Sequence, residues 1–338
     1  MQQRQPIPIT VIGGFLGAGK TTLLNRLIRN LRGKRRLGVM VNDFGSINID
    51  AELVVDVDGD MVSLGGGCIC CSIRADLVRS IHQMAGRVDA PEHIIVEASG
   101  VSDPAAIARA ISGPQAEGLV ELDAVVVVVD AEDHLEAGFR QRLVAGGHLK
   151  AADIVVLSKV DLLDEERLAA VQAKIHKSVP KARVLTATRG DVSPELLLGL
   201  RRDSMPELSD VKVRVRDAEQ PVDHTTTFST WSFTTEVPLS PRRLRKVIER
   251  LPPSIFRVKG LVQITRERDR QAVLHVVGRR AELDLGASWG DMAPHSRLVF
   301  IGEPGGVDSA SLTEQLRGCE VRDGDEGSAM MRWLRSFA

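Results

Sequence analysis

A glycine-rich segment at residues 13–21 constrains this chain more than any other feature of its sequence. It reads G-G-F-L-G-A-G-K-T and contains G-x-x-x-x-G-K-T, a pattern that turns successive backbone N–H groups toward a phosphate. Residues 7–12 before it are mainly apolar and predict a buried strand, whereas residues 22–28 predict a helix that begins at the loop. A strand, a loop and a helix in this order predict a phosphate-binding loop rather than a chance glycine turn.

Two side chains of this loop have predicted chemical roles. We expect Lys20 to reach the β- and γ-phosphates of a nucleoside triphosphate, and the Thr21 hydroxyl to bind Mg²⁺. The glycines let the backbone approach the phosphates closely, and the N-terminus of the following helix adds positive potential. The predicted phosphate-binding residues are Gly14, Gly17, Ala18, Gly19, Lys20, Thr21 and Thr22.

The composition narrows the class of protein. The 338 residues carry a net charge of −1, which predicts no general surface for nucleic acid or membranes. Aromatic residues make up 3% of the chain and tyrosine is absent, which argues against a base-stacking surface for single-stranded nucleic acid. No apolar run approaches the length of a membrane span and the first residues lack a signal-peptide pattern, so we expect a cytoplasmic protein.

Short apolar runs alternate with segments of helical periodicity up to about residue 200. This alternation predicts an α/β domain over residues 1–200, with the P-loop NTPase fold: a doubly wound, mostly parallel sheet covered by helices on both faces. The predicted strands are residues 7–12, 37–41, 61–64, 93–96, 124–129, 154–157 and 184–186. The predicted helices are residues 22–28, 72–84, 104–111, 165–178 and 194–200.

The pattern changes after residue 200. Residues 201–223 are charged and poorly periodic, which predicts a linker. Residues 224–320 predict a small C-terminal α+β domain of ferredoxin-like type, and residues 321–338 form a tail. The expected elements of this domain are strands at 225–235, 255–264, 272–277 and 297–301 and helices at 241–251 and 309–318.

Two segments that follow predicted strands carry carboxylates. Asp43 lies in N-D-F-G after the second strand, where it can bind Mg²⁺, although Asn and Asp also favour plain turns. Glu97 ends an apolar strand in a Walker B-like arrangement, near the metal ion or the attacking water; a capping turn is the alternative. Ser99 and Gly100 suit backbone contact with the γ-phosphate. The predicted catalytic residues are Lys20, Thr21, Asp43 and Glu97, of which Thr21, Asp43 and Glu97 are the Mg²⁺ ligands.

A second motif indicates which base is bound. The segment S-K-V-D begins at Ser158 and follows a buried strand. The Asp161 carboxylate can accept two hydrogen bonds from guanine, whereas adenine offers no such pair of donors. The stem of Lys159 can lie along the base, and Ala187 after the next strand can donate its backbone N–H to the guanine oxygen. A lone K-x-D is a weak signal, but its position after a buried strand of a P-loop protein favours guanine.

Three of the four cysteines lie within four residues, in G-G-G-C-I-C-C. Thiolates select Zn²⁺, Cu⁺ and similar ions, so Cys68 and Cys70 predict a transition-metal site, with Cys71 assisting or buried. A redox pair or plain buried cysteines are the alternatives. Three thiolates would leave one coordination position open, which suits a site that releases its metal. Cys319 is isolated and predicts a core residue, and the eight histidines show no metal-ligand spacing.

These motifs, in this order, resemble those of the CobW-like GTPases, metallochaperones akin to the nickel-delivery GTPases UreG and HypB. The segments that carry the resemblance are G-G-F-L-G-A-G-K-T-T-L-L-N, N-D-F-G, G-G-G-C-I-C-C, V-E-A-S-G and S-K-V-D. It spans residue 8 to about residue 200 and continues more weakly in F-S-T-W-S-F, R-V-K-G and R-L-V-F-I-G of the second domain. The resemblance implies GTP hydrolysis to GDP coupled to insertion of Zn²⁺, Co²⁺ or another transition metal into a client metalloprotein.

Two departures from the family pattern affect the predicted site. Asp43 stands where the family has glutamate in N-E-F-G, and it matches the N-D of UreG-type loops. Ser158 replaces the asparagine of N-K-x-D, so the support of the asparagine amide is lost and we expect guanine preference with reduced affinity. A histidine-rich metal-storage stretch found in some members is absent from this sequence.

Two other functions are consistent with parts of the sequence. A nucleotide-gated regulator or scaffold would sense the metal without delivering it. A small-molecule kinase would use the P-loop but needs an acceptor pocket and a lid with arginines, which the sequence does not indicate, and it leaves the cysteines unexplained. The sequence leaves open the physiological metal, the client and whether the protein forms a homodimer.

Overall fold

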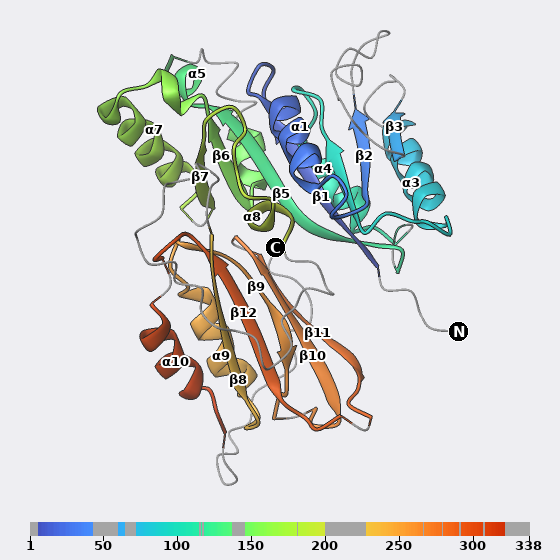
Figure 1. Ribbon diagram of the computed structural model, residues 1–338, viewed down its shortest axis with the longest axis vertical. Helices are drawn as coiled ribbons and strands as arrows, with labels where there is room; N and C mark the ends of the chain where they lie inside the picture. Colours follow the sequence, from blue (N-terminus) through green and yellow to red (C-terminus); the bar gives the residue numbers. More distant parts are fainter. Residues whose placement is uncertain are drawn as a thin grey trace. The chain divides into compact units, whose positions relative to one another are not determined.

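The computed structural model describes most of the chain as two compact units. The described residues are 6–42, 60–64, 72–114, 116, 118–136, 146–180, 182–199, 228–265, 267–278, 280–290, 292–306 and 308–321. The first unit is Met1–Leu198 and the second is Gly199–Ala338 (Figure 1). The predicted linker at 201–223 lies outside the described residues, as does the predicted tail except for residue 321.

A seven-stranded sheet in which every strand pairs in parallel forms the centre of the first unit, in the order β3-β2-β4-β1-β5-β6-β7. The central strands are almost continuous runs of buried β-branched and apolar residues, as expected for strands covered on both faces. The strands are β1 Ile7–Gly14, β2 Leu37–Asn42, β3 Asp60–Leu64, β4 His93–Glu97, β5 Val120–Asp130, β6 Ile154–Ser158 and β7 Arg183–Ala187.

Helices cover both faces of this sheet, which confirms the predicted fold class. On one face α3, α4 and α7 pack against alternate residues of β1, β4, β5 and β6, and on the other face α1 and α8 contact the sheet (Figure 1). Among the described residues no helix is long and apolar enough to cross a membrane. The helices are α1 Lys20–Leu31, α3 Ser72–Ala85, α4 Pro104–Ile111, α5 Ala131–Glu136, the 3-10 turn η1 Val160–Leu162, α7 Glu165–Ser178 and α8 Pro194–Leu198.

A chain of polar groups, all buried except the half-buried Arg35, ties α1 to β4 at the amino ends of the strands, opposite the P-loop. Arg35, just past α1, lies 3.0 Å from His93 Nδ1. Because a guanidinium can only donate, His93 accepts at Nδ1 and carries its proton on Nε2. His93 Nε2 lies 2.9 Å from Thr10 Oγ1, which donates to Asp123 at 3.2 Å. Arg35 also donates to the Leu198 carbonyl at 3.4 Å, so one side chain links α1, β4 and the end of α8.

The second unit is an antiparallel five-stranded sheet in the order β11-β10-β9-β12-β8, with α9 and α10 packed on one face. The connection from β8 through α9 to β9 leaves room for β12 between the two parallel strands, which is the split β-α-β arrangement of ferredoxin-like folds. The elements are β8 Ser229–Thr235, α9 Pro241–Glu249, β9 Ile255–Val262, β10 Arg270–Val277, β11 Arg280–Ser288, β12 Ser296–Gly302 and α10 Ser309–Arg317.

One strand of this unit was not predicted. β11 forms a hairpin with β10, and its outward residues Glu282 and Asp284 interrupt any apolar run. A strand at the edge of a sheet with one polar face needs few apolar residues, so the sequence signal is weak. Cys319 is a buried core residue of this unit, as predicted, and burial raises the pKa of its thiol to about 11.

Candidate nucleotide-binding site

The predicted nucleotide-binding segments meet at one edge of the first sheet. Because all strands run in parallel, the ends of β1, β4, β5, β6 and β7 lie together at the carboxyl edge. The register pairs Ser158 with both Asp130 and Ala187, and pairs Glu97 with Ile12 two residues before the P-loop. This edge, at a change of strand order, is where open α/β sheets bind ligands.

The P-loop has a backbone that requires its glycines. Gly14, Gly17 and Gly19 have φ values of 141°, 76° and 94°, in the region that favours glycine. No side chain caps α1 at Gly19, and its first turn contains no acidic residue. The N-terminus of α1 therefore offers positive potential to a bound anion.

Lys20 is held close against this loop. Its side chain is buried, and Nζ donates to the Phe15 carbonyl at 3.1 Å. A buried ammonium group is costly unless it is well solvated by protein dipoles or an anion. The hydrogen bond keeps the charge over the loop, where a phosphate would lie.

Thr21 and Glu97 are 76 residues apart in the sequence, and the fold brings their side chains into direct contact. The Thr21 hydroxyl donates to Glu97 Oε1 at 2.8 Å, and Glu97 is 1% exposed at the end of β4. Because the proton of Thr21 points to the carboxylate, the oxygen lone pairs of Thr21 remain available to a cation. The capping alternative for Glu97 does not apply, since Asp103 caps α4 by accepting from the Ala105 N–H at 2.9 Å.

The loop between β4 and α4, residues 98–103, packs directly on the P-loop. A Cβ atom on Gly100 would lie 2.6 Å from the Leu16 backbone nitrogen, so only glycine allows this approach. Ser99 and Ser102 are buried in the same loop, whereas Leu16 is 57% exposed. Any ligand group that displaces the P-loop at Leu16 would therefore also displace the β4–α4 loop.

Ser158 connects the guanine motif to the P-loop. Its hydroxyl lies 2.6 Å from the Ala18 carbonyl and 3.2 Å from the Val129 carbonyl. The expected loss of the asparagine amide's support, with reduced guanine affinity, stays a prediction. The shorter serine hydroxyl reaches the phosphate-binding loop, a contact that sequence reasoning missed.

Lys159 and Asp130 form an ion pair that the sequence did not indicate. Lys159 has the left-handed backbone angle φ 56°, and Nζ lies 2.5 Å from Asp130 Oδ2. The hydrogen bond to Asp130 raises the pKa of Lys159. Asp130 also accepts from the Glu132 N–H at 3.0 Å and so caps α5. The ion pair fixes the lysine beside the end of β5, and the only sequence signal was an acid that ends a buried strand.

The remaining residues of the predicted base site flank this pair. Asp161 is exposed on η1, and Ala187 is buried at the end of β7. Gly190 follows at φ 72°, and a Cβ atom there would lie 3.0 Å from Leu23 Cα of α1. Arg26 of α1 bonds Asp191 at 3.1 Å, so this loop is fastened to the helix that follows the P-loop.

Four predicted site residues lie outside the described residues: Asp43, Cys68, Cys70 and Cys71. The strands that precede them are described, however. β2 and β3 pair in parallel with Asn42 opposite Leu64, so both strands end at the edge that carries Glu97 and the P-loop. Within the described part of the chain, no group of three or more His, Cys, Asp or Glu residues is placed to hold a metal ion.

The fold and this site define the chain as a P-loop nucleotide-binding protein. The model of the CobW/HypB/UreG nucleotide-binding domain matches residues 8–186, and that of the cobalamin synthesis protein CobW C-terminal domain matches residues 228–320. The chain therefore belongs to the CobW family, which confirms the recognition made from the sequence motifs.

Three curated relatives are similar to this chain in sequence. The zinc chaperone CobW of Pseudomonas aeruginosa is 30% identical over 354 residues, which cover 94% of this chain and 92% of the relative. The zinc chaperone YjiA of Escherichia coli is 30% identical over 314 residues, covering 88% of this chain and 94% of the relative. The zinc-regulated GTPase metalloprotein activator 1 of Schizosaccharomyces pombe is 31% identical over 199 residues, covering 55% of this chain and 46% of the relative. The prediction that this chain belongs to a family of GTPases is thus confirmed.

Proposed function

We propose that this protein hydrolyses GTP and uses the change from GTP to GDP to bind and release a transition metal, zinc in the first place, for a client metalloprotein. The observation that carries the GTPase part is the hydrogen bond from Thr21 to Glu97. It joins the P-loop helix to the end of β4, in a protein of the CobW family.

The described residues fit a Mg²⁺–nucleotide complex. The Thr21 oxygen has lone pairs directed away from Glu97, and the buried carboxylate fixes that orientation. Lys20 and the N-terminus of α1 supply positive potential for the phosphates. We assign Thr21 to Mg²⁺, with Glu97 as its support or as a ligand, and Asp43 as a second carboxylate.

The segment S-K-V-D, residues 158–161, forms the proposed guanine-binding part of the site. Ser158 holds the motif to the P-loop, Asp130 holds Lys159, and Asp161 is exposed to receive a base. The Ala187 N–H is assigned to the guanine oxygen, as the sequence predicted. Ser99 and Gly100 are assigned to the γ-phosphate, because their loop packs against the P-loop at Leu16.

The metal part of the proposal rests on the place of the cysteines in the chain. Cys68 and Cys70, with Cys71 assisting, follow β3, whose carboxyl end lies at the nucleotide edge of the sheet. Thiolates favour zinc among the abundant divalent ions, and Co²⁺ is the second candidate. Three relatives named for zinc chaperoning or zinc regulation support zinc.

Base selectivity is a direct test of the GTPase assignment. We expect GTP to bind at least tenfold more tightly than ATP, a difference of about 1.4 kcal/mol. Asp161→Asn should reduce this preference to below about threefold, because the amide cannot accept from both guanine donors. Titration with fluorescent GTP and ATP analogues measures both affinities. Glu166→Gln, an exposed change on the nearby helix α7, is the matched control and should keep the wild-type preference.

Equal affinities of the wild type for GTP and ATP would contradict the assignment.

Metal delivery is separable from metal sensing by a second experiment. Zinc-loaded protein is mixed with a chromophoric chelator as acceptor, and the transfer rate is compared with GTP, a non-hydrolysable GTP analogue and GDP. A chaperone should transfer zinc faster in one nucleotide state, whereas a sensor or scaffold should retain it in all three.

A further inference from the structure

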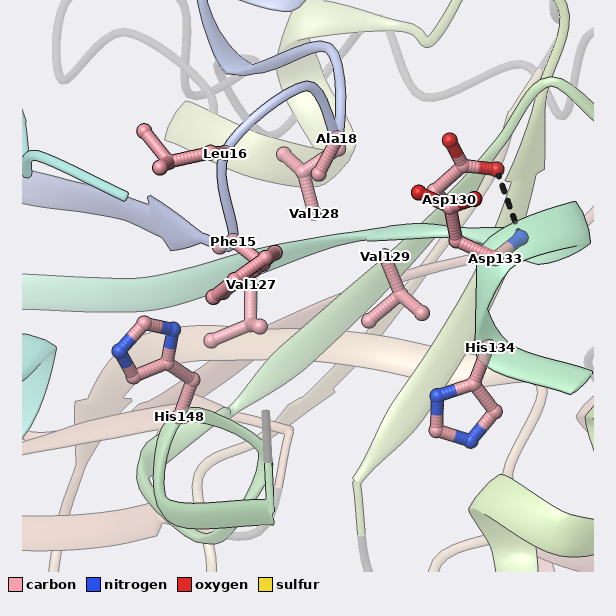
Figure 2. Close-up of a pocket in the computed structure, with 11 residues that line it drawn as sticks. Phe15, Leu16, Ala18, Val127, Val128, Val129, Asp130, Asp133, His134 and His148 are labelled. Carbon is pink, nitrogen blue, oxygen red and sulfur yellow. Dashed lines mark hydrogen bonds between the residues drawn. The ribbon is translucent and has the colours of Figure 1, made fainter. Parts of the chain in front are cut away.

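Asp130 is a buried carboxylate at the end of β5, and its two oxygens have different partners. Oδ1 accepts from the backbone N–H groups of Glu132 at 3.0 Å and of Asp133 at 3.3 Å, and Figure 2 draws the second of these bonds. Oδ2 lies 2.5 Å from Lys159 Nζ. Because the first turn of α5 fixes one oxygen, the carboxylate presents the other in a single direction, toward Lys159.

The guanine motif and Asp130 are neighbours because β5 and β6 pair in register. Asp130 lies opposite Ser158, the residue before Lys159. Ser158 is itself fixed, since its hydroxyl bonds the Ala18 carbonyl of the P-loop and the Val129 carbonyl of β5. The strand end that carries the motif is thus attached to the P-loop on one side and to β5 on the other.

The ion pair anchors the end of the Lys159 side chain and leaves the rest of it accessible. The side chain of Lys159 is 42% exposed, whereas that of Asp130 is 6% exposed. The hydrogen bond to Asp130 raises the pKa of Lys159, and nearby acidic charges act in the same direction against desolvation, so the ammonium group stays charged. A lysine that is anchored in this way can present its methylene groups to a base in one fixed position.

Lys159 also determines how the chain turns from β6 into η1. Its backbone has φ 56° and ψ 31°, in the left-handed region, which a non-glycine residue keeps only where its surroundings hold it. Asp161, the residue that we assign to guanine, follows two positions later on η1. The position of Asp161 therefore depends on the geometry at Lys159, and the ion pair with Asp130 is a tertiary contact that fixes this geometry.

We propose that Asp130 is a positioning residue that determines guanine specificity: it anchors Lys159 and so holds Asp161 where both guanine donors can reach it. The inference rests on the proposed GTPase function and adds to it a residue outside the S-K-V-D segment. Its physical basis is preorganisation, because side chains that are ordered before the base arrives need not be ordered by it. Asp130 contacts α5 and Lys159, so we expect loss of its charge to act on the choice of base and not on the hydrolytic step.

Asp130→Asn separates the ion pair from the helix cap. Asparagine keeps a side-chain oxygen for the N–H groups of α5 and caps helices about as well as aspartate, but it carries no charge for Lys159. We expect the ratio of GTP affinity to ATP affinity to fall at least about fivefold. KM for GTP should rise by a similar factor, while kcat at saturating GTP stays within about twofold of wild type. Titration with fluorescent GTP and ATP analogues and steady-state GTP hydrolysis measure these quantities.

A double variant tests whether the effect passes through Lys159. Lys159→Met keeps an apolar side chain of similar length but removes the ammonium group, so it should lower the affinity ratio by about the same factor as Asp130→Asn. The two changes remove the same interaction, and the double variant should therefore match either single variant within about twofold. Lys159→Met changes a partly exposed side chain, so this arm gives an answer even where Asp130→Asn does not fold.

Asp164→Asn is the matched control. Asp164 caps α7 by accepting from the Arg167 N–H at 2.8 Å, shortly after Asp161 in the chain, and among the described residues it forms no ion pair with a lysine. The same exchange of cap residue should leave the affinity ratio and kcat at wild-type values. Thermal unfolding of every variant shows whether its first unit is folded.

Unchanged GTP preference in a folded Asp130→Asn protein, or in Lys159→Met, would overturn the inference, and so would losses that add in the double variant. A higher GTP affinity in Asp130→Asn would also overturn it, because the ion pair would then compete with the base for Lys159. Each of these results leaves the GTPase proposal in place. Equal affinities of the wild type for GTP and ATP would instead reject the proposed guanine site, and this inference with it.

Discussion

Replacing Lys20 with alanine is expected to lower the rate of GTP hydrolysis at least a hundredfold. The ammonium group is buried over the P-loop and bonds the Phe15 carbonyl, so it is already positioned where phosphate charge would develop. Removing one preorganised group of this kind typically costs about 10²–10³ in kcat. Release of phosphate under single-turnover conditions, with the variant saturated by GTP, measures the chemical step directly.

The matched control is Lys177→Ala, which removes an exposed lysine from the last turn of α7. It changes the net charge equally and should keep wild-type turnover. Circular dichroism and GDP binding show whether each variant is folded. Wild-type turnover in a folded Lys20→Ala protein would mean that the P-loop is not the hydrolytic site.

A methyl group at Gly14 is expected to destabilise the first unit by about 3 kcal/mol or more, because two separate penalties add. The first is conformational, since φ is 141°. The second is steric, since the new Cβ atom would lie 2.3 Å from the Val128 carbonyl oxygen, and neither backbone can move without breaking the β1–β5 pairing. Native-state hydrogen exchange of the β1 and β5 amides in Gly14→Ala measures the local free energy of opening.

Gly33→Ala separates the two penalties. Gly33 also has a left-handed backbone, with φ 69°, but a Cβ atom there meets nothing within 4 Å. It should therefore cost only the conformational part, about 1 kcal/mol. Equal effects of the two substitutions would show that the close approach of β1 to β5 does not constrain the P-loop.

The sequence predicted the elements whose signals are local. The P-loop at Gly14–Lys20 needs a strand, glycines with positive φ and a helix, all of which are contiguous in the chain. The runs that became β4, β5 and β6 are apolar because parallel strands are covered on both faces, so length and composition identified them. The Walker B-like interpretation of Glu97 followed from its position at the end of such a run.

The sequence could not predict contacts that the fold creates between distant residues. Asp130 and Lys159 are 29 residues apart and meet because β5 and β6 pair in register. His148 was one of eight histidines without a metal-ligand pattern, and only the fold places it in a pocket that Phe15 and Leu16 of the P-loop also line. The sequence did not indicate the contact of the Ser158 hydroxyl with the Ala18 carbonyl, because that contact depends on tertiary structure.

Two elements that the sequence did not predict, α5 and β11, were missed for a related reason. α5 has only six residues, and its start depends on the Asp130 cap rather than on a long apolar stripe. β11 is half polar. In both cases neighbouring elements supply most of the stabilisation, so intrinsic preference and periodicity are weak guides.

The proposed function requires coupling between the bound nucleotide and the cysteine loop. Cys68 follows β3 and Asp43 follows β2, and both strands end at the edge of the sheet where Glu97 meets Thr21. A rearrangement of that edge between GTP and GDP states should therefore change the geometry of the thiolates. Linkage requires that zinc then changes GTP affinity by the same factor as GTP changes zinc affinity.

Zinc titration of the full-length protein, with a competing indicator, in the presence of either a non-hydrolysable GTP analogue or GDP, tests this coupling most directly. Cys68→Ser/Cys70→Ser should remove the site, whereas Cys319→Ala, which changes the core cysteine of the second unit, should leave it intact. We predict one zinc ion per chain and a difference between the two nucleotide states of about 5- to 150-fold in affinity. Identical zinc affinities in the two states would contradict the account, because a GTPase with a passive metal site has no physical means of coupling hydrolysis to metal release.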